Sequence, residues 1–189
     1  LGGDDFDKRI VDYLAAEFKE AHGVDLTTDP IAMQRLKEVA EETKIELSEV
    51  RESNILCEAI TMSDKGPLTL ESTITREKFE QIIGDLIEGT KKPIDLALRD
   101  AGLKASDIDT VLLVGGSTRI PLVQETVKSH LKLTPHRDIS PEEVVALGAA
   151  IQSEMLAPLD GDLDGQLAAH VDEDKMVVIH MTPFSLGVG

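Results

Sequence analysis

Apolar residues recur at helical spacing near the start of the chain, at Phe6, Ile10, Tyr13, Leu14 and Phe18. This spacing predicts an amphipathic helix. Asp4 or Asp5 is the expected N-cap of this helix, because a side-chain oxygen there accepts a hydrogen bond from an unpaired backbone N–H group. The helix is expected to run to about His22 and to stop at Gly23.

A second helix is predicted from Asp29 onward. Asp29 suits an N-cap and Pro30 suits the first helical position. The helical pattern continues to Leu47 or Ser48. The expected apolar stripe consists of Ile31, Leu36, Val39, Ala40 and Leu47.

The apolar period shortens to two over residues 50–74, which indicates strands. Turn-forming residues at 63–67 divide this segment, so we expect an antiparallel hairpin. The alternating positions are Ile55, Cys57 and Ala59 on one side of the turn and Leu68, Leu70 and Ser72 on the other.

Helical spacing returns after the hairpin. Thr75 is expected to cap a third helix that carries Phe79 and Ile83, and Pro93 is expected to start a fourth that ends near Gly102. Residues 110–120 then predict a buried strand that breaks at two glycines into a helix reaching about Leu131.

The clearest predicted helix start is at Ser140, where Pro141 stands at the first helical position and Glu143 completes a capping box. Small residues in this helix, such as Gly148, favour close packing on a sheet. The chain therefore shows a helix-rich α+β region up to about residue 82 and an α/β region after it.

Composition narrows the function classes. The chain has 189 residues, with 36 acidic side chains against 19 basic ones and a formal net charge of −17. This charge repels a phosphate backbone, so nucleic acid is not an expected partner. The longest apolar runs are far shorter than the roughly 18 residues that span a bilayer, so no membrane association is expected.

The cysteine content and the first residue also carry information. Cys57 is the only cysteine, so it cannot form an internal disulfide, and a reducing cytoplasm is the simplest setting. Because the chain begins at Leu1 without an initiator methionine, we expect a piece of a longer protein.

Two kinds of site find little support. Asp160, Asp162 and Asp164 resemble the opening of a calcium loop, but Val171 stands where a closing glutamate is needed, so an acidic linker is the preferred interpretation. The five histidines show no metal-binding spacing. No metal site and no Ser/His/Asp catalytic set is predicted.

One helix face carries polar groups that could hold a ligand. Glu41, Lys44 and Ser48 project from the same face of the second helix, where they could bind ribose hydroxyls or form an ordinary solvated surface. The turn at Gly115 and Gly116 exposes backbone N–H groups and suits a phosphate or a sugar. It matches neither the phosphate-loop motif nor the dinucleotide motif.

Arg119 follows this turn. A guanidinium group can lie flat on an aromatic ligand, although an ordinary surface arginine is the alternative interpretation.

Five motifs in one order carry a resemblance to a known family: LGGDDFD at 1–7, RLKEVAEETKIELS at 35–48, VGGSTRIP at 114–121, SPEEVVALGAA at 140–150 and TPFSLG at 182–187. Together they resemble the seventy-kilodalton heat-shock chaperone family of the DnaK type. The resemblance covers residues 1–153 almost continuously and resumes near Met176.

The resemblance implies an actin-like, ribonuclease H-like ATPase fold, of which the chain holds only the second lobe. Residues 1–82 then form the outer helical and hairpin subdomain and residues 83–156 the inner α/β subdomain. Residues 157–181 hold an acidic insert and the hydrophobic interdomain linker at residues 176–179, and residues 182–189 begin the peptide-binding domain.

The resemblance also implies a set of nucleotide contacts: Glu41, Lys44, Ile45, Ser48, Gly115, Gly116, Ser117, Arg119, Ile120 and Glu142. Nucleotide (ATP or ADP) is the implied ligand, and most ligands of the accompanying Mg²⁺ ion lie outside this chain. The other implied partners are a nucleotide-exchange factor, a J-domain co-chaperone and unfolded peptide. The chain alone is expected to lack ATPase activity.

Three departures from the family pattern affect these expectations. Glu142 and His180 stand where the family usually has aspartate, and the segment over residues 154–175 is longer and more acidic than usual. An alternative function for the chain is a non-enzymatic module that docks a nucleotide-exchange factor through the outer subdomain.

Overall fold

The computed structural model describes residues 1–64, 66–136 and 140–156. The chain divides into two compact units, Leu1–Ala149 and Ala150–Gly189. The predicted linker, the calcium-like aspartates, His180 and the start of a peptide-binding domain lie outside the described residues. The predicted subdomain boundary between residues 82 and 83 stays a prediction.

Helix α1 (Gly3–His22) has the predicted extent but a different N-terminus. Gly2, not Asp4 or Asp5, is the N-cap, and the Asp5 carboxylate accepts a 2.8 Å hydrogen bond from the Gly2 N–H. The predicted cap is therefore wrong, because the carboxylate reaches back to the cap from the third helical position. Gly23 ends the helix in the left-handed region, with φ 71°.

Helix α2 (Pro30–Glu49) begins as predicted. A short 3₁₀ turn, η1 (Leu26–Thr28), leads into it. The Asp29 side chain accepts hydrogen bonds from the backbone N–H groups of Ile31 and Ala32 at 2.9 Å and 3.2 Å. These bonds satisfy two donors that the first helical turn would otherwise leave unpaired.

The apolar stripe of α2 is confirmed except in its first turn. Leu36, Ala40 and Leu47 are fully buried, whereas Ile31 is 73% exposed. Ala32 is buried in place of Ile31. The helical spacing therefore identified the correct face, and only its N-terminal limit was wrong.

Strands β1 (Glu52–Ser63) and β2 (Gly66–Thr75) form the predicted antiparallel hairpin, in a two-stranded sheet. The register is interrupted between Cys57 and Thr61. Ala59 lies in this irregularity with a positive φ of 48°, and it is exposed. Ile60 is buried instead, so the predicted inward position of Ala59 is wrong. Between the pairs Cys57–Leu70 and Thr61–Leu68, β1 contains two more residues than β2, and this bulge changes the alternation of buried positions.

Arg35 fixes this bulge to α2. Its guanidinium donates 2.7 Å hydrogen bonds to the carbonyl oxygens of Glu58 and Ala59. These carbonyls lack regular ladder partners at the bulge, so the arginine satisfies acceptors that the sheet leaves open.

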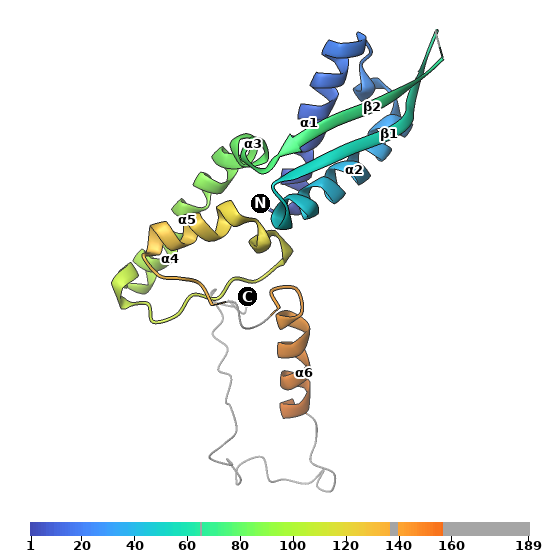
Figure 1. Ribbon diagram of the computed structural model, residues 1–189. Helices are drawn as coiled ribbons and strands as arrows, with labels where there is room; N and C mark the ends of the chain where they lie inside the picture. Colours follow the sequence, from blue (N-terminus) through green and yellow to red (C-terminus); the bar gives the residue numbers. More distant parts are fainter. Residues whose placement is uncertain (65, 137–139, 157–189) are drawn as a thin grey trace, which may run out of the picture. The chain divides into compact units, whose positions relative to one another are not determined.

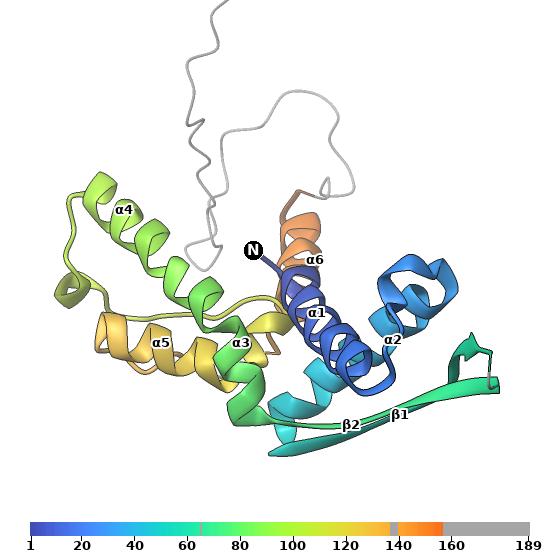
Figure 2. The same cartoon turned by 90° about the horizontal axis from the view of Figure 1, so that it is seen from above.

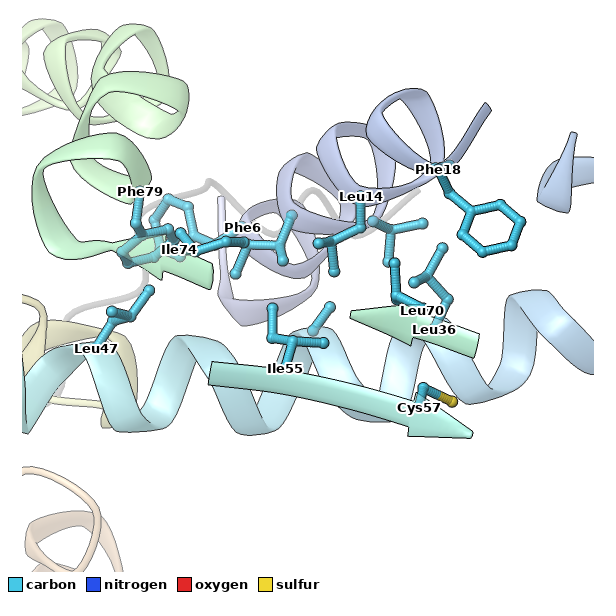
Figure 3. Packing of buried hydrophobic residues seen from close by; sticks show 14 of the residues in the cluster. Phe6, Leu14, Phe18, Leu36, Leu47, Ile55, Cys57, Leu70, Ile74 and Phe79 are labelled. Carbon is cyan, nitrogen blue, oxygen red and sulfur yellow. The ribbon is translucent and has the colours of Figure 1, made fainter. Parts of the chain in front are cut away.

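Helices α1 and α2 lie on the same face of the hairpin, as Figures 1 and 2 show from two directions. The core fills the space between them. Figure 3 shows Phe6 near Ile74 and Phe79 at one end of the core, and Phe18 at the other end. The fully buried large side chains are Phe6, Phe18, Phe79, Ile10, Leu14, Leu26, Leu36, Leu47, Ile60, Leu70, Ile74 and Ile83.

Four α-helices follow the hairpin in the described residues. Helix α3 (Arg76–Gly89) is capped by Thr75, as predicted, and α5 (Pro121–Leu131) packs against α3. Helix α4 (Lys91–Ala101) starts two residues before the predicted Pro93 and buries no residue.

The predicted buried strand at residues 110–114 is wrong for the described structure. An isolated parallel bridge joins Leu112 to His136, with a 2.9 Å hydrogen bond from the His136 N–H to the Val111 carbonyl. Leu112 is 60% exposed and Val114 is 48% exposed. A strand needs a neighbouring strand to satisfy its backbone groups, and the described residues supply one bridge only.

Helix α6 (Val144–Leu156) starts three residues later than the predicted start at Pro141. Residues 141–143 form a turn, in which the Val144 N–H donates to the Ser140 carbonyl at 3.0 Å. Val145, Leu147 and Ile151 are more than half exposed, so the expected packing of this helix on a sheet is absent from the described residues.

Replacing a core leucine should test this packing. Leu36→Ala removes a fully buried side chain and should lower the free energy of unfolding by about 2–5 kcal/mol. Leu56→Ala is the matched control, because Leu56 is 63% exposed and should lose about 0.5 kcal/mol or less. Urea denaturation measures both, and equal losses would contradict the core assignment.

A surface carboxylate gives the fold a predictable pH dependence. Hydrogen bonds from Lys19 and Thr27 lower the pKa of Asp25 from 3.8 to about 2. Because the pKa of Asp25 is lower in the folded state than in the unfolded state, ionised Asp25 stabilises the folded protein. This contribution to the free energy of unfolding is complete above pH 3.8 and is lost as the pH falls through about 2.

Asp25→Asn should therefore lower the melting temperature at neutral pH, and its difference from wild type should narrow as the pH falls from 3.8 toward 2. Thermal melts across this range measure the effect. Asp100→Asn changes a carboxylate that is 76% exposed and serves as the control. A difference between wild type and Asp25→Asn that is constant with pH would refute the linkage.

Candidate functional site

The double-glycine turn is held in place by backbone hydrogen bonds. Gly115 has φ 94°, a conformation that favours glycine, and the 3₁₀ turn η3 (Gly116–Arg119) follows it. The Gly115 N–H donates to the Pro141 carbonyl at 2.7 Å, and the Thr118 N–H and hydroxyl both donate to the Gly115 carbonyl. The turn is therefore tied to the segment before α6.

Arg119 and Glu142 strengthen this connection. The guanidinium donates from Nε to Oε1 at 2.8 Å and from Nη2 to Oε2 at 3.0 Å, a bidentate pair. Hydrogen bonding to Arg119 holds the pKa of Glu142 below 4.5, so the pair persists at neutral pH and is lost only as acid protonates the carboxylate. A Cβ on Gly116 would lie 3.3 Å from Glu142 Oε1, so a side chain there would crowd the pair.

A pocket of about 250 Å³ lies between α2 and this turn. It is lined by Ser48, Glu49, Leu113, Thr118, Arg119, Gln124, His136 and Pro141. Two predicted site residues, Ser48 and Arg119, thus meet at one cavity although they are far apart in the sequence.

Lys44 lies one helical turn before Ser48, whose hydroxyl donates to the Lys44 carbonyl at 3.3 Å. The Lys44 ammonium forms an ion pair with Asp7 on α1, at 2.8 Å from Oδ1 and 2.9 Å from Oδ2. A Cβ added to Gly3 would lie 3.0 Å from Lys44 Nζ and 3.8 Å from the Ser117 hydroxyl. Lys44 and Ser117 therefore approach the same point beside the start of α1.

Besides Ser48 and Arg119, none of the predicted site residues lines the 250 Å³ pocket. Glu41 is exposed and lines a different groove, between α1 and α2. Ile45 is 57% exposed, and Ile120 is only 1% exposed and belongs to the hydrophobic core. A contact between ligand and the Ile120 side chain would require the core to open.

Sequence reasoning missed several residues at this site. Glu49, Thr118, Gln124 and His136 line the pocket, and Asp7 partners Lys44. Glu49 and Thr118 are next to predicted site residues in the sequence, so their position along the chain could have identified them. Nothing in the spacing links Asp7 to Lys44, because the two positions are 37 residues apart.

The pocket offers a hydroxyl, a carboxylate and a guanidinium beside apolar surface, a combination that can orient a flat ligand with polar edges. Among the described residues, no group of three or more His, Cys, Asp or Glu side chains is placed to hold a metal ion. No helix within the described ranges has the length and hydropathy needed to cross a membrane.

Comparison with known proteins agrees with the motif-based prediction. A family model described as Hsp70 protein matches residues 1–189. The chaperone protein DnaK of Thermosipho africanus (strain TCF52B) is 47% identical over 188 residues, which cover 100% of this chain and 30% of that protein. The chain thus spans about 30% of the length of this relative. With a family model that matches the whole sequence, the chain belongs to the Hsp70 family.

Proposed function

We propose that this chain is the second lobe of an actin-like ATPase domain and forms the adenosine-binding half of a nucleotide clamp in an ATP-dependent molecular chaperone. The observation that carries the proposal is the meeting of Ser48 and Arg119 at one pocket in a member of the Hsp70 family. In the whole protein, the nucleotide state would control the binding and release of unfolded peptides.

The geometry of Arg119 suits an adenine ring. Glu142 engages the guanidinium along one edge, through Nε and Nη2, and so fixes the plane of the group. The flat faces of the guanidinium remain available for stacking, since the hydrogen bonds lie in its plane. Ser48 lines the same pocket and supplies a hydroxyl that can donate to or accept from a base or sugar.

The size of the pocket supports half a clamp. About 250 Å³ is below the roughly 300–1,000 Å³ of complete small-molecule pockets. A pocket of this volume can hold part of a nucleotide, and a second lobe would have to close over the rest of the ligand. On the basis of the family resemblance, we propose that most ligands of the Mg²⁺ ion lie elsewhere in the whole protein.

The partners and location follow from the same proposal. We propose that a nucleotide-exchange factor docks on residues 1–82. The alternative function is that the chain serves only as this docking module, without an enzymatic role. We also propose that a J-domain co-chaperone acts on the whole protein. The single cysteine, Cys57, is buried and unpaired, in keeping with the proposed cytoplasmic location.

Removing the Arg119 guanidinium should weaken nucleotide binding. Arg119→Ala, made in a longer chain that carries both lobes, should lose a stacking contribution of about 0.5–2 kcal/mol. This corresponds to about a 2- to 30-fold weaker affinity for ADP. Calorimetric titration measures it. Arg99→Ala removes an arginine that is 72% exposed on α4 and is the matched control. Equal affinities for both variants would count against the proposed site.

The 189-residue chain alone should show no ATPase activity above background. Hydrolysis requires the phosphates, the metal and the attacking water to be positioned together, and one lobe supplies only part of that arrangement. Phosphate release from magnesium ATP measures the activity, with a two-lobed chain as the positive control. Turnover by the 189-residue chain well above background would refute this prediction.

A further inference from the structure

We propose that Asp7 is a positioning residue for nucleotide binding: its carboxylate holds the Lys44 ammonium in the direction required to reach the ribose. This inference rests on the proposed function. It assigns to α1, which contributes no residue to the pocket beside Arg119, a direct part in shaping the nucleotide site.

The ion pair is close and well shielded. Lys44 Nζ lies within 2.9 Å of both carboxylate oxygens of Asp7, and the two side chains are only 13% and 15% exposed. Among the ion pairs of the described residues, the others each include a side chain that is more than a third exposed. A charge so far removed from water needs a partner, and the hydrogen bond that Lys44 Nζ donates to Asp7 Oδ2 fixes the direction of the ammonium.

Gly3 provides the space that this arrangement needs. A Cβ at this position would lie 3.0 Å from Lys44 Nζ, so a side chain would push the ammonium aside. The same Cβ would lie 3.8 Å from the Ser117 hydroxyl. The ammonium is thus directed to the place where α1, α2 and the turn η3 approach one another.

Packing of α1 on α2 does not require the pair. Fully buried apolar side chains already join the two helices, including Ile10 and Leu14 on α1 and Leu36 on α2. Replacing a shielded ion pair by neutral groups is often close to neutral for stability. The Lys44–Asp7 pair is therefore better explained by its orientation of Lys44 than by a contribution to the stability of the fold.

The test compares ADP with 2′,3′-dideoxy-ADP by calorimetric titration into a longer chain that carries both lobes. In wild type the ribose hydroxyls should favour ADP. Asp7→Asn should weaken ADP binding about tenfold, leave the dideoxy nucleotide nearly unchanged, and so remove the preference between the two. Lys44→Met should behave in the same way, and the double variant should lose no more than either single variant.

Two further variants keep the test decisive. Gly3→Ala requires the ammonium to shift by a few tenths of an ångström while leaving Asp7 in place, so it should reduce the preference for ADP and tests the orientation of Lys44 independently of Asp7→Asn. Asp85→Asn breaks the exposed pair between Arg9 on α1 and Asp85 on α3, and it should leave both affinities unchanged.

The outcomes separate the two proposals. If wild type binds no ADP, the proposed function fails and the positioning role fails with it. If wild type binds ADP and Lys44→Met removes the preference while Asp7→Asn keeps it, the positioning role alone is overturned. A loss in Asp7→Asn that is equal for both nucleotides indicates a general structural effect and also overturns it.

Discussion

The hairpin of β1 and β2 can persist only if one of its faces is covered. A two-stranded sheet has too little apolar surface of its own to be stable in water. Helices α1 and α2 cover that face, and the side chains between them form the main core. This requirement fixes where α2 lies, and α2 carries Lys44 and Ser48. The position of the candidate site therefore depends on the packing of this core.

Packing is uneven along the chain. The core includes α1, α2, both strands and α3, whereas α4 buries no residue and the segment at 110–114 stays largely exposed. The double-glycine turn lies in this less packed region. It is held by hydrogen bonds and by the Arg119–Glu142 pair rather than by apolar burial. Polar contacts of this kind are directional, so they can define a turn geometry where little surface is buried.

Two ion pairs shape the two sides of the site in different ways. The Arg119–Glu142 pair is half exposed and is expected to add little stability, but it orients a planar group beside the pocket. The Lys44–Asp7 pair is shielded, so its geometry is more strongly determined by the surrounding atoms. Each pair therefore acts by orienting a side chain rather than by stabilising the fold.

The sequence by itself determined the local elements and the family. The helical spacing, the Asp29 and Thr75 caps and the alternation around residues 63–67 identified α1, α2, α3 and the hairpin, because each rests on hydrogen bonds or contacts between neighbours in the chain. The five motifs identified the Hsp70 family.

Only the tertiary structure decided which distant groups meet. The partnership of Asp7 with Lys44, the shared pocket of Ser48 and Arg119, and the burial of Ile120 depend on how separate elements pack. The apolar run at 110–114 predicted a buried strand, yet the described residues provide a single bridge for it. The sequence pattern of a segment predicts which helix or strand it can form, whereas strand pairing and burial require a partner that the segment does not contain.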